Sequence, residues 1–364
     1  MNLATVDKIA KAVLYEGYML YPYRPSSVKN QQRWNFGVLC PQSYSEAQKG
    51  GEAWTMQTEC LVEGSSLAAI EVRVRFLQLV ARSVGELSAP VSELPPDETP
   101  EFRLVEKLEL NGRVYQPWQE AIEREWCLPV YNAQALSWQP VQERFSYPDE
   151  KQFEQLLDLT GKAAGVIVRE RKALCGTVEI RSERIDDGVF KIGVLIRNTT
   201  PFEAFENSSR DQALLSSMAS AHTVVGVQDG KFISLMAPPE QFSKLAENCK
   251  NIGTWPVLVG EEGQCDTVLS SPIILYDYPQ IAPESAGDLF DGTEIDEILS
   301  LRIMTLTDDE KREMSQSDER ARQMLERTES MPVEQLMKLH GVLRGLRPVE
   351  PSLRHLRSPR EETQ

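Results

Sequence analysis

The stretch Ile70-Glu71-Val72-Arg73-Val74-Arg75-Phe76 alternates apolar side chains with charged ones at every position. A period of two places the apolar side chains on one face of a β-strand and the charged ones on the other. The apolar positions then shift to Leu77 and Leu79, and such a shift predicts a β-bulge. The stretch therefore predicts a half-buried strand.

Turn dipeptides on both sides of this strand predict antiparallel neighbours. Asn111-Gly112, Asp187-Gly188 and Asp229-Gly230 each lie between strand-like apolar segments. Asn-Gly and Asp-Gly supply the positive φ angles that tight type I′ turns require. Glu262-Gly263 is a further candidate for such a turn. We therefore expect β-hairpins in both halves of the chain.

The segments between these strands have other patterns. Residues 86–101 are rich in proline and acidic side chains, which predicts an exposed loop. Residues 152–159 and 239–249 predict short helical or loop-like insertions. Residues 4–15 predict an amphipathic helix, because apolar side chains recur at i, i+3, i+4 and i+7.

From about Ser285 onward the sequence predicts helices. Thr293 is expected to cap a first helix, and Thr307-Asp308-Asp309-Glu310 has the pattern of a capping box that starts a second. A third helix is expected around residues 321–325. Pro332 is expected at the start of a fourth, which Gly345 ends.

This order of elements predicts an α+β fold, with two antiparallel, sandwich-like β-rich units followed by an α-helical C-terminal subdomain. We expect an N-terminal β-rich domain with a leading helix over residues 1–150 and a second antiparallel domain over 151–285. The helical subdomain is expected over 286–345. Residues 346–364 hold prolines and arginines without an apolar period, so they are expected to form a flexible tail.

The charge balance narrows the range of partners. The 364 residues include 39 Lys and Arg against 55 Asp and Glu, so the formal net charge is −16. Because an acidic chain is repelled by phosphate backbones and anionic membranes, we expect no nucleic-acid partner. No stretch approaches the roughly 18 apolar residues that span a bilayer, and charged side chains interrupt residues 1–16. We therefore expect a cytoplasmic protein without membrane insertion.

Residues that carry catalysis or bind metals are sparse. The cysteines form no Cys-x-x-Cys pair, there are only 3 histidines, and the common nucleophile, phosphate-loop and zinc motifs are missing. We therefore expect no catalytic residue, no metal and no cofactor. One alternative stays open, namely a pocket that includes His222, at the entry to a predicted strand, together with Tyr21, Tyr23 and Arg24.

The densest polar and aromatic segment joins the predicted sheet to the predicted helices. Its prolines restrict the backbone, and aromatic side chains are favoured at the centres of protein interfaces, so the segment is a candidate partner-binding surface. Two alternatives are a solvated connecting loop and a structural clasp between sheet and helices. The candidate binding residues are Tyr276, Asp277, Tyr278, Gln280, Glu284, Asp288, Phe290, Asp291 and Glu294.

Several distinctive motifs extend along the chain to about Arg344. They are Leu14-Tyr15-Glu16-Gly17-Tyr18, Leu20-Tyr21-Pro22-Tyr23-Arg24-Pro25-Ser26, Arg33-Trp34, Phe36-Gly37, the run from Ser271 to Ser285, the run from Gly287 to Glu297, Leu336-Met337 and Leu339-His340-Gly341. This set resembles an uncharacterised bacterial family that is found beside high-affinity, actinobacterial-type [NiFe]-hydrogenase genes. The resemblance implies a context of hydrogenase production or assembly.

Together these observations predict a non-enzymatic accessory or assembly factor. We expect it to bind a protein partner, and the resemblance implies a hydrogenase subunit or a maturation factor. One alternative is an enzyme or small-ligand-binding protein with a pocket between the β-rich units. Another is a structural subunit of a larger complex.

Overall fold

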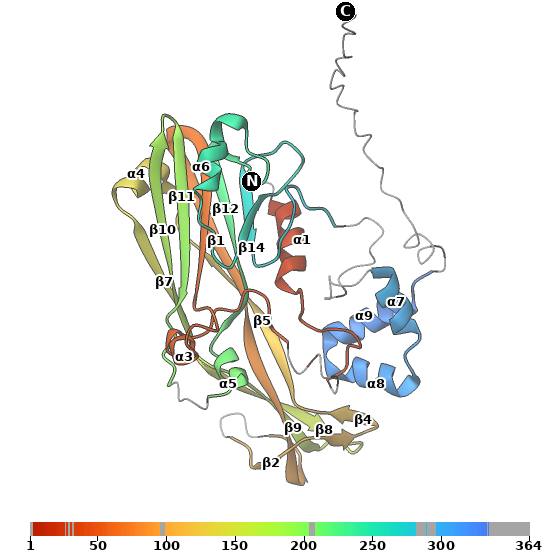
Figure 1. Cartoon of the computed structure of the whole chain (residues 1–364). Coiled ribbons are helices and arrows are strands. Elements are labelled where there is room, and N and C mark those ends of the chain that lie inside the picture. The colour runs from red at the N-terminus through yellow and green to blue at the C-terminus, as the bar shows by residue number, and fades with distance from the viewer. Residues whose placement is uncertain are drawn as a thin grey trace, which may run out of the picture.

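The computed structural model of the protein describes residues 3–25, 27, 30, 33–94, 99–203, 208–281, 289, 296–332 and 334. Antiparallel strands make up most of the regular structure, and helices lie at both ends of the described chain (Figure 1). The predicted α+β class, with antiparallel strands followed by C-terminal helices, is confirmed.

The strands share one twelve-stranded sheet, apart from the two-stranded sheet of β3 and β4. The strands are β1 (Thr55–Val91), β2 (Phe102–Val105), β3 (Leu108–Leu110), β4 (Arg113–Tyr115), β5 (Trp118–Cys127), β6 (Tyr131–Asn132), β7 (Val141–Tyr147), β8 (Glu150–Leu157), β9 (Ala163–Arg171), β10 (Leu174–Asp186), β11 (Val189–Asn198), β12 (Met218–Ile233), β13 (Trp255–Leu258) and β14 (Thr267–Ser271). The helices are α1 (Leu3–Leu14), α3 (Gln42–Ala47), α4 (Ala133–Trp138), α5 (Arg210–Leu214), the 3-10 helix η1 (Glu240–Phe242), α6 (Ser243–Glu247), α7 (Asp296–Met304), α8 (Asp308–Ser317) and α9 (Glu319–Glu329).

β1 is the centre of the large sheet. Its first part pairs with β11, its middle part with β12 and β5, and its last part with β9 and β2, all antiparallel. Every second residue from Ile70 to Phe76 is buried. The register against β12 shifts between Arg75 and Leu77. The predicted strand and its predicted bulge are therefore both confirmed.

Three of the predicted hairpins are confirmed, and one is wrong. Asn111-Gly112 joins β3 to β4, Asp187-Gly188 joins β10 to β11, and Glu262-Gly263 lies between the paired strands β13 and β14. Asp229-Gly230, however, lies inside β12, and the residues on both sides of it pair with β1. Opposite it, the register of β1 shifts between Gly64 and Ala69. The positive φ of Asp229 therefore accommodates an irregularity within a strand and does not reverse the chain.

Two predicted irregular segments are strands in the structure. The insertion expected over residues 152–159 is mostly β8, which pairs with β9 from Glu150 to Leu157. The loop expected over residues 86–101 begins as the end of β1, where Leu87 pairs with Phe102 of β2. In both places the hydrogen bonds to a neighbouring strand outweigh the local composition, as is common for β-structure.

The main hydrophobic core is built largely from side chains of the large sheet. β1, β10, β11 and β12 all contribute fully buried side chains to it, such as Val74 and Val194. Because β1 pairs with strands on both sides of residue 150, the two β-rich parts of the chain share one sheet. The division into folding units at residues 150 and 285 stays a prediction.

A second core joins the N-terminal loop to the C-terminal helices. Tyr18 and Trp34 of the loop pack with Leu79 of β1 and with Met324 and Leu325 of α9. Figure 1 shows α7, α8 and α9, in blue, grouped beside the sheet. The N-terminal loop therefore connects the helical region to the sheet.

The helix predictions are confirmed where the structure describes them. At the start of α8 the Thr307 side chain accepts a hydrogen bond from the Glu310 backbone, and the Glu310 side chain accepts one from the Thr307 backbone. α1, α7, α9 and the short helices η1 and α6 also form where helical structure was expected. The cap at Thr293, residues 335–345 of the expected fourth helix and the expected tail over 346–364 lie outside the described residues.

Candidate functional site

The middle of the candidate partner-binding segment is anchored to the sheet. Asp277 Oδ1 accepts a hydrogen bond of 2.8 Å from the backbone N–H of Leu258 in β13, and Asp277 Oδ2 accepts one of 2.5 Å from the Ser234 hydroxyl. The backbone N–H of Tyr278 donates to the carbonyl of Leu258 at 2.7 Å. These three bonds fix residues 277 and 278 against β13, the outermost strand of the sheet order.

The Tyr278 side chain packs inward. Its ring lies against the main hydrophobic core, and its hydroxyl lies 3.5 Å from the Cys265 thiol. Partial burial, together with the hydrogen bond to Cys265, raises the pKa of the Tyr278 hydroxyl to about 12. These contacts clasp Asp277 and Tyr278 to the sheet, and none of them reaches a helix among the described residues, so a clasp between sheet and helices stays a prediction.

The same segment turns other side chains toward solvent. Tyr276 is 80% exposed, Ile274 is 69% exposed and Ile281 is 44% exposed, and Gln280 is exposed as well. We call Ile274, Tyr276 and Ile281 the loop surface. The remaining candidates lie outside the described residues: Glu284, Asp288, Phe290, Asp291 and Glu294.

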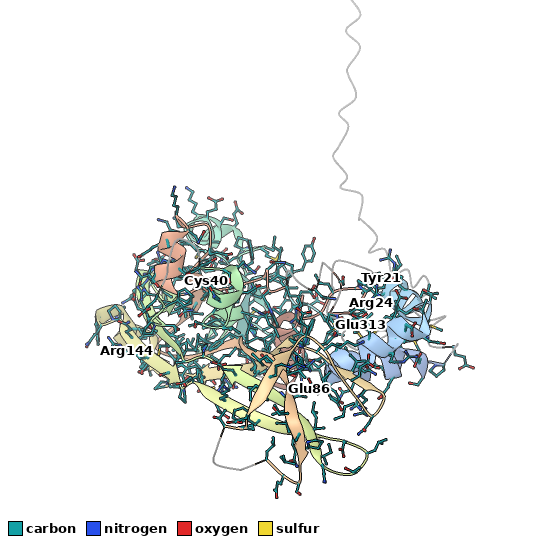
Figure 2. All side chains as sticks on the ribbon, turned by 90° about the horizontal axis from the view of Figure 1, so that it is seen from below. Tyr21, Arg24, Cys40, Glu86, Arg144 and Glu313 are labelled. Carbon is teal, nitrogen blue, oxygen red and sulfur yellow. The ribbon has the colours of Figure 1, made fainter. Side chains whose placement is uncertain are left out.

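Tyr21, Tyr23 and Arg24 contact the helical region. The Tyr23 hydroxyl donates to the carbonyl of Leu289 at 2.9 Å, and the guanidinium carbon of Arg302 lies 5.2 Å from the centre of the Tyr21 ring. Arg24 forms ion pairs with two carboxylates of α8, and Figure 2 shows it beside one of them, Glu313. Tyr21 and Arg24 therefore help to hold α7 and α8 in place, whereas Tyr23 holds Leu289, which precedes them in the chain.

His222 belongs to a different part of the fold. It is fully buried in β12, where it pairs with Arg75 of β1, and its Nδ1 lies 2.9 Å from the carbonyl oxygen of Ser220. Burial lowers the pKa of His222 to about 4, so the ring is neutral near pH 7. The structure shows no contact that joins His222 to Tyr21, Tyr23 or Arg24 in one pocket within its described part.

A cluster of tyrosine and arginine side chains attaches α9 to the sheet. The Tyr15 hydroxyl donates to Glu123 of β5 at 2.8 Å, and the Tyr18 hydroxyl donates to Asp318 at 2.6 Å. The guanidinium carbon of Arg320 lies 3.9 Å from the centre of the Tyr15 ring. This cluster forms one end of a cleft between the sheet and the helices.

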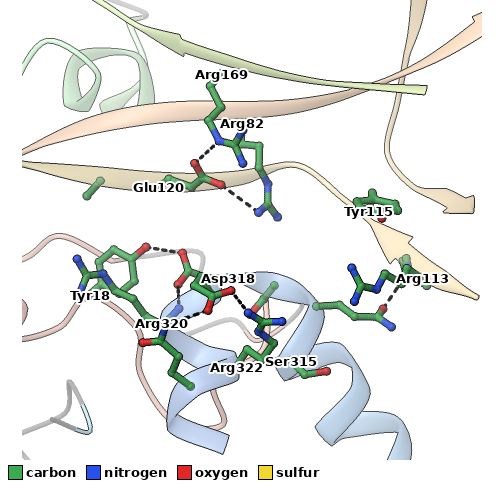
Figure 3. A pocket seen from close by; sticks show the side chains of 16 residues that line it. Tyr18, Arg82, Arg113, Tyr115, Glu120, Arg169, Ser315, Asp318, Arg320 and Arg322 are labelled. Carbon is green, nitrogen blue, oxygen red and sulfur yellow. Dashed lines mark hydrogen bonds and ion pairs between the residues drawn. The ribbon is translucent and has the colours of Figure 1, made fainter. Parts of the chain in front are cut away.

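The cleft has a volume of about 760 Å³ (Figure 3). Its walls come from β1, β4, β5 and β9 on one side, and from the end of α8 and the start of α9 on the other. Five arginines line it against three carboxylates, although the whole chain carries a net charge of −16. These residues are Arg82, Arg113, Arg169, Arg320, Arg322, Glu120, Asp318 and Glu319.

The cleft arginines differ in how strongly they are held. Glu120 forms ion pairs with Arg82 at 3.1 Å and with Arg169 at 2.7 Å. The Arg82 side chain is only 9% exposed, and its Nε has no hydrogen-bond partner in the described structure. Arg113 is exposed in β4, and its side chain makes no hydrogen bond or ion pair with the residues that the structure describes. Arg82 uses one N–H of each terminal nitrogen, to Glu120 and to the carbonyl of Gln116, so it keeps one on each for a further acceptor, and the guanidinium of Arg113 keeps all of its own.

No pattern in the sequence points to this cleft. Its arginines come from four elements that are far apart along the chain, namely β1, β4, β9 and α9. Each element contributes only one or two of the five arginines, so no local run of basic residues indicates the cleft. The cleft lies where α8 and α9 meet the sheet, and the N-terminal loop packs against one end of it.

Among the described residues there is no cluster of three or more His, Cys, Asp or Glu side chains arranged to hold a metal ion. Nor does that part of the chain contain a helix both long enough and apolar enough to cross a membrane. The sequence matches no protein-family model, and a search of curated proteins gives no match.

Proposed function

We propose that this protein is a non-enzymatic factor that binds another protein through the loop surface formed by Ile274, Tyr276 and Ile281. The resemblance to the hydrogenase-associated family favours a partner in [NiFe]-hydrogenase production, either a hydrogenase subunit or a maturation factor. The alternatives are a ligand-binding or enzymatic role and a structural role in a larger complex.

One observation carries the proposal. Tyr276 is 80% exposed, yet the next residue, Asp277, is hydrogen bonded to both Leu258 and Ser234. An aromatic side chain on a fixed backbone loses little conformational freedom when it enters a partner's pocket. Aromatic side chains of this kind supply much of the binding energy at protein interfaces.

The charge of the chain favours a partner with a basic surface. The net charge of −16 attracts such a surface over a distance of roughly 10 Å at 0.1 M salt. Charge attraction of this kind mainly raises the association rate, whereas the buried aromatic contact mainly slows dissociation. The loop surface is therefore expected to determine affinity.

The test is quantitative affinity capture from native cells with the parent chain and with Tyr276→Ala. Truncation of a central aromatic residue typically costs about 2 kcal/mol or more, which corresponds to at least a tenfold loss of affinity. We expect the specific partner to be depleted by about tenfold with Tyr276→Ala. Mass spectrometry then shows whether the depleted protein is a hydrogenase subunit or a maturation factor.

Trp138→Ala is the matched control, because Trp138 is 79% exposed on α4. A protein captured by the parent and by Trp138→Ala, but lost with Tyr276→Ala, supports the proposal. If both variants capture the same proteins in the same amounts as the parent, the loop surface is not a binding surface. If the depleted protein has no part in hydrogenase production, the expected context is wrong while the binding role holds.

A further inference from the structure

The arginine-lined cleft combines three features that favour an anionic ligand. It is positively charged within an acidic protein, it has a volume of about 760 Å³, and two of its arginines keep unused N–H groups. Pockets for small molecules commonly measure roughly 300–1,000 Å³. We propose that this cleft binds a small organic phosphate ester, with Arg82, Arg113 and Arg322 around its phosphoryl group.

The arrangement of the arginines favours a phosphate over a carboxylate. Figure 3 shows Arg82, Arg113 and Arg322 around the same open space, and they come from β1, β4 and α9. A carboxylate has two oxygens in one plane, which a single guanidinium fork satisfies. A phosphoryl group has three oxygens that point in different directions, so it can accept from arginines on several sides.

The donors for such a ligand are present. Each guanidinium has five N–H groups. Arg82 uses one to Glu120 and one to the carbonyl of Gln116, and Arg322 donates to Glu319. Arg113 uses none with the described residues. The phosphoryl group would therefore add hydrogen bonds without breaking the ion pair that holds Arg82.

The rest of the cleft suits an organic group on the phosphate. The volume exceeds what a single phosphate ion fills, and Val114, Tyr115 and Ala121 provide apolar surface in the lining. Tyr115 is half-buried and packs against the small core beneath β3 and β4, so its ring is held in place. Apolar walls with a few fixed polar groups are typical of small-molecule sites.

The test is isothermal titration of the full chain with phenyl phosphate, and separately with isophthalate. Both probes carry an aromatic ring and two negative charges near pH 7.5, but only the first has a phosphoryl group. We expect phenyl phosphate to bind with a Kd below about 1 mM at low salt. Isophthalate is expected to bind at least about tenfold more weakly, because its oxygens are coplanar.

Arg113→Gln is the informative variant, because this exposed side chain has no partner whose loss would disturb the described fold. Loss of one charge-assisted hydrogen bond is expected to weaken phenyl phosphate binding by about tenfold. Arg144→Gln is the matched control: Arg144 is exposed on β7, without a partner in the described structure, and Figure 2 places it far from the helical region. Thermal melting checks that both variants fold.

The outcomes separate the site from general charge attraction. A tenfold loss with Arg113→Gln, with no change for Arg144→Gln, supports the proposal. The proposal is overturned if the Kd for phenyl phosphate is above about 1 mM at low salt, if both variants bind it as the parent does, or if isophthalate binds as tightly. Because the loop surface lies on residues 274–281, Tyr276→Ala should leave phenyl phosphate binding unchanged, so this proposal and the proposed function are tested independently.

Discussion

The hydroxyl of Tyr18 donates a 2.6 Å hydrogen bond to the carboxylate of Asp318, which joins the N-terminal loop to the start of α9. The same Asp318 caps that helix, because its side chain accepts from the backbone N–H of Arg320. Tyr18 is only 2% exposed, and its burial raises its pKa well above the ordinary range. One carboxylate thus starts a helix and attaches it to the rest of the fold, so the cleft depends on this contact.

Tyr18→Phe removes the hydroxyl and leaves the ring. The variant should lose a hydrogen bond to a charged group, which is worth about 1.5–3 kcal/mol in the free energy of unfolding. Urea denaturation of parent and variant measures this difference. Tyr276→Phe is the control, because the Tyr276 hydroxyl is on an exposed side chain and its loss should change stability by less than about 0.5 kcal/mol. Equal stability of Tyr18→Phe and the parent would show that the contact does not hold α9.

His222 should make stability depend on pH. Its pKa falls from an ordinary value of 6.5 to about 4 in the fold, mainly because the ring is buried. The unfolded chain therefore takes up a proton at a higher pH than the folded one. The contribution of the neutral His222 to the free energy of unfolding is therefore fully present above about pH 6.5. It is lost as the pH falls toward 4, by about 3 kcal/mol in all.

His222→Asn separates this effect from the titration of carboxylates. The asparagine amide can donate to the carbonyl of Ser220, as Nδ1 of the histidine does, but it does not titrate. Urea denaturation at several pH values from 7 to 4 should show the parent losing about 3 kcal/mol more than the variant. Parallel losses in the two proteins would contradict a buried neutral His222.

Sequence patterns predicted the parts of the fold that local chemistry determines. The alternation from Ile70 to Phe76 and the turn at Asp187-Gly188 each specify one local conformation, and both predictions are confirmed. Asp229-Gly230 has the same local pattern, but pairing with β1 on both sides keeps it within a strand. Residues 152–159 likewise gain their strand conformation from β9. Long-range pairing is the information that local patterns lack.

In the candidate site, too, local patterns predicted part of the structure and long-range contacts determined the rest. Local composition pointed to the segment that contains Tyr276, but not to which of its side chains face the protein interior. Only the contacts of Asp277 with Leu258 and Ser234 separate the clasp from the loop surface. The cleft could not be predicted because Arg82 and Arg322, which are far apart in the sequence, line one space only in the folded chain. No spacing of residues in the sequence indicates that these two arginines share a cleft.

Two glycines on neighbouring strands provide a test of packing. A Cβ added to Gly176 of β10 would lie 2.3 Å from the Phe145 ring and 2.6 Å from Met218, inside the main core. A Cβ added to Gly193 of β11 would instead meet the flexible side chain of Arg181 at 2.8 Å. Gly176→Ala should lower the unfolding free energy by about 1–3 kcal/mol, because overpacking forces a rigid ring to move. Gly193→Ala should cost clearly less in the same urea experiment. If the two variants are equally stable, the core around Phe145 is looser than described.

Asp277→Ala tests whether the clasp supports the loop surface. The variant removes both acceptors, so the backbone N–H of Leu258 and the hydroxyl of Ser234 lose their partner. An unpaired buried donor costs about 1–3 kcal/mol, and hydrogen exchange should become faster in residues 255–258 and 274–281. Tyr276→Ala, which removes only an exposed side chain, should leave both stability and exchange near those of the parent.

The same variant tests whether partner binding needs the backbone of residues 274–281 to be held in place. If it does, Asp277→Ala should weaken partner capture although Tyr276 is intact, because the loop must then become ordered at the moment of binding. Undiminished capture by Asp277→Ala, together with faster exchange, would show that the partner does not depend on an ordered loop.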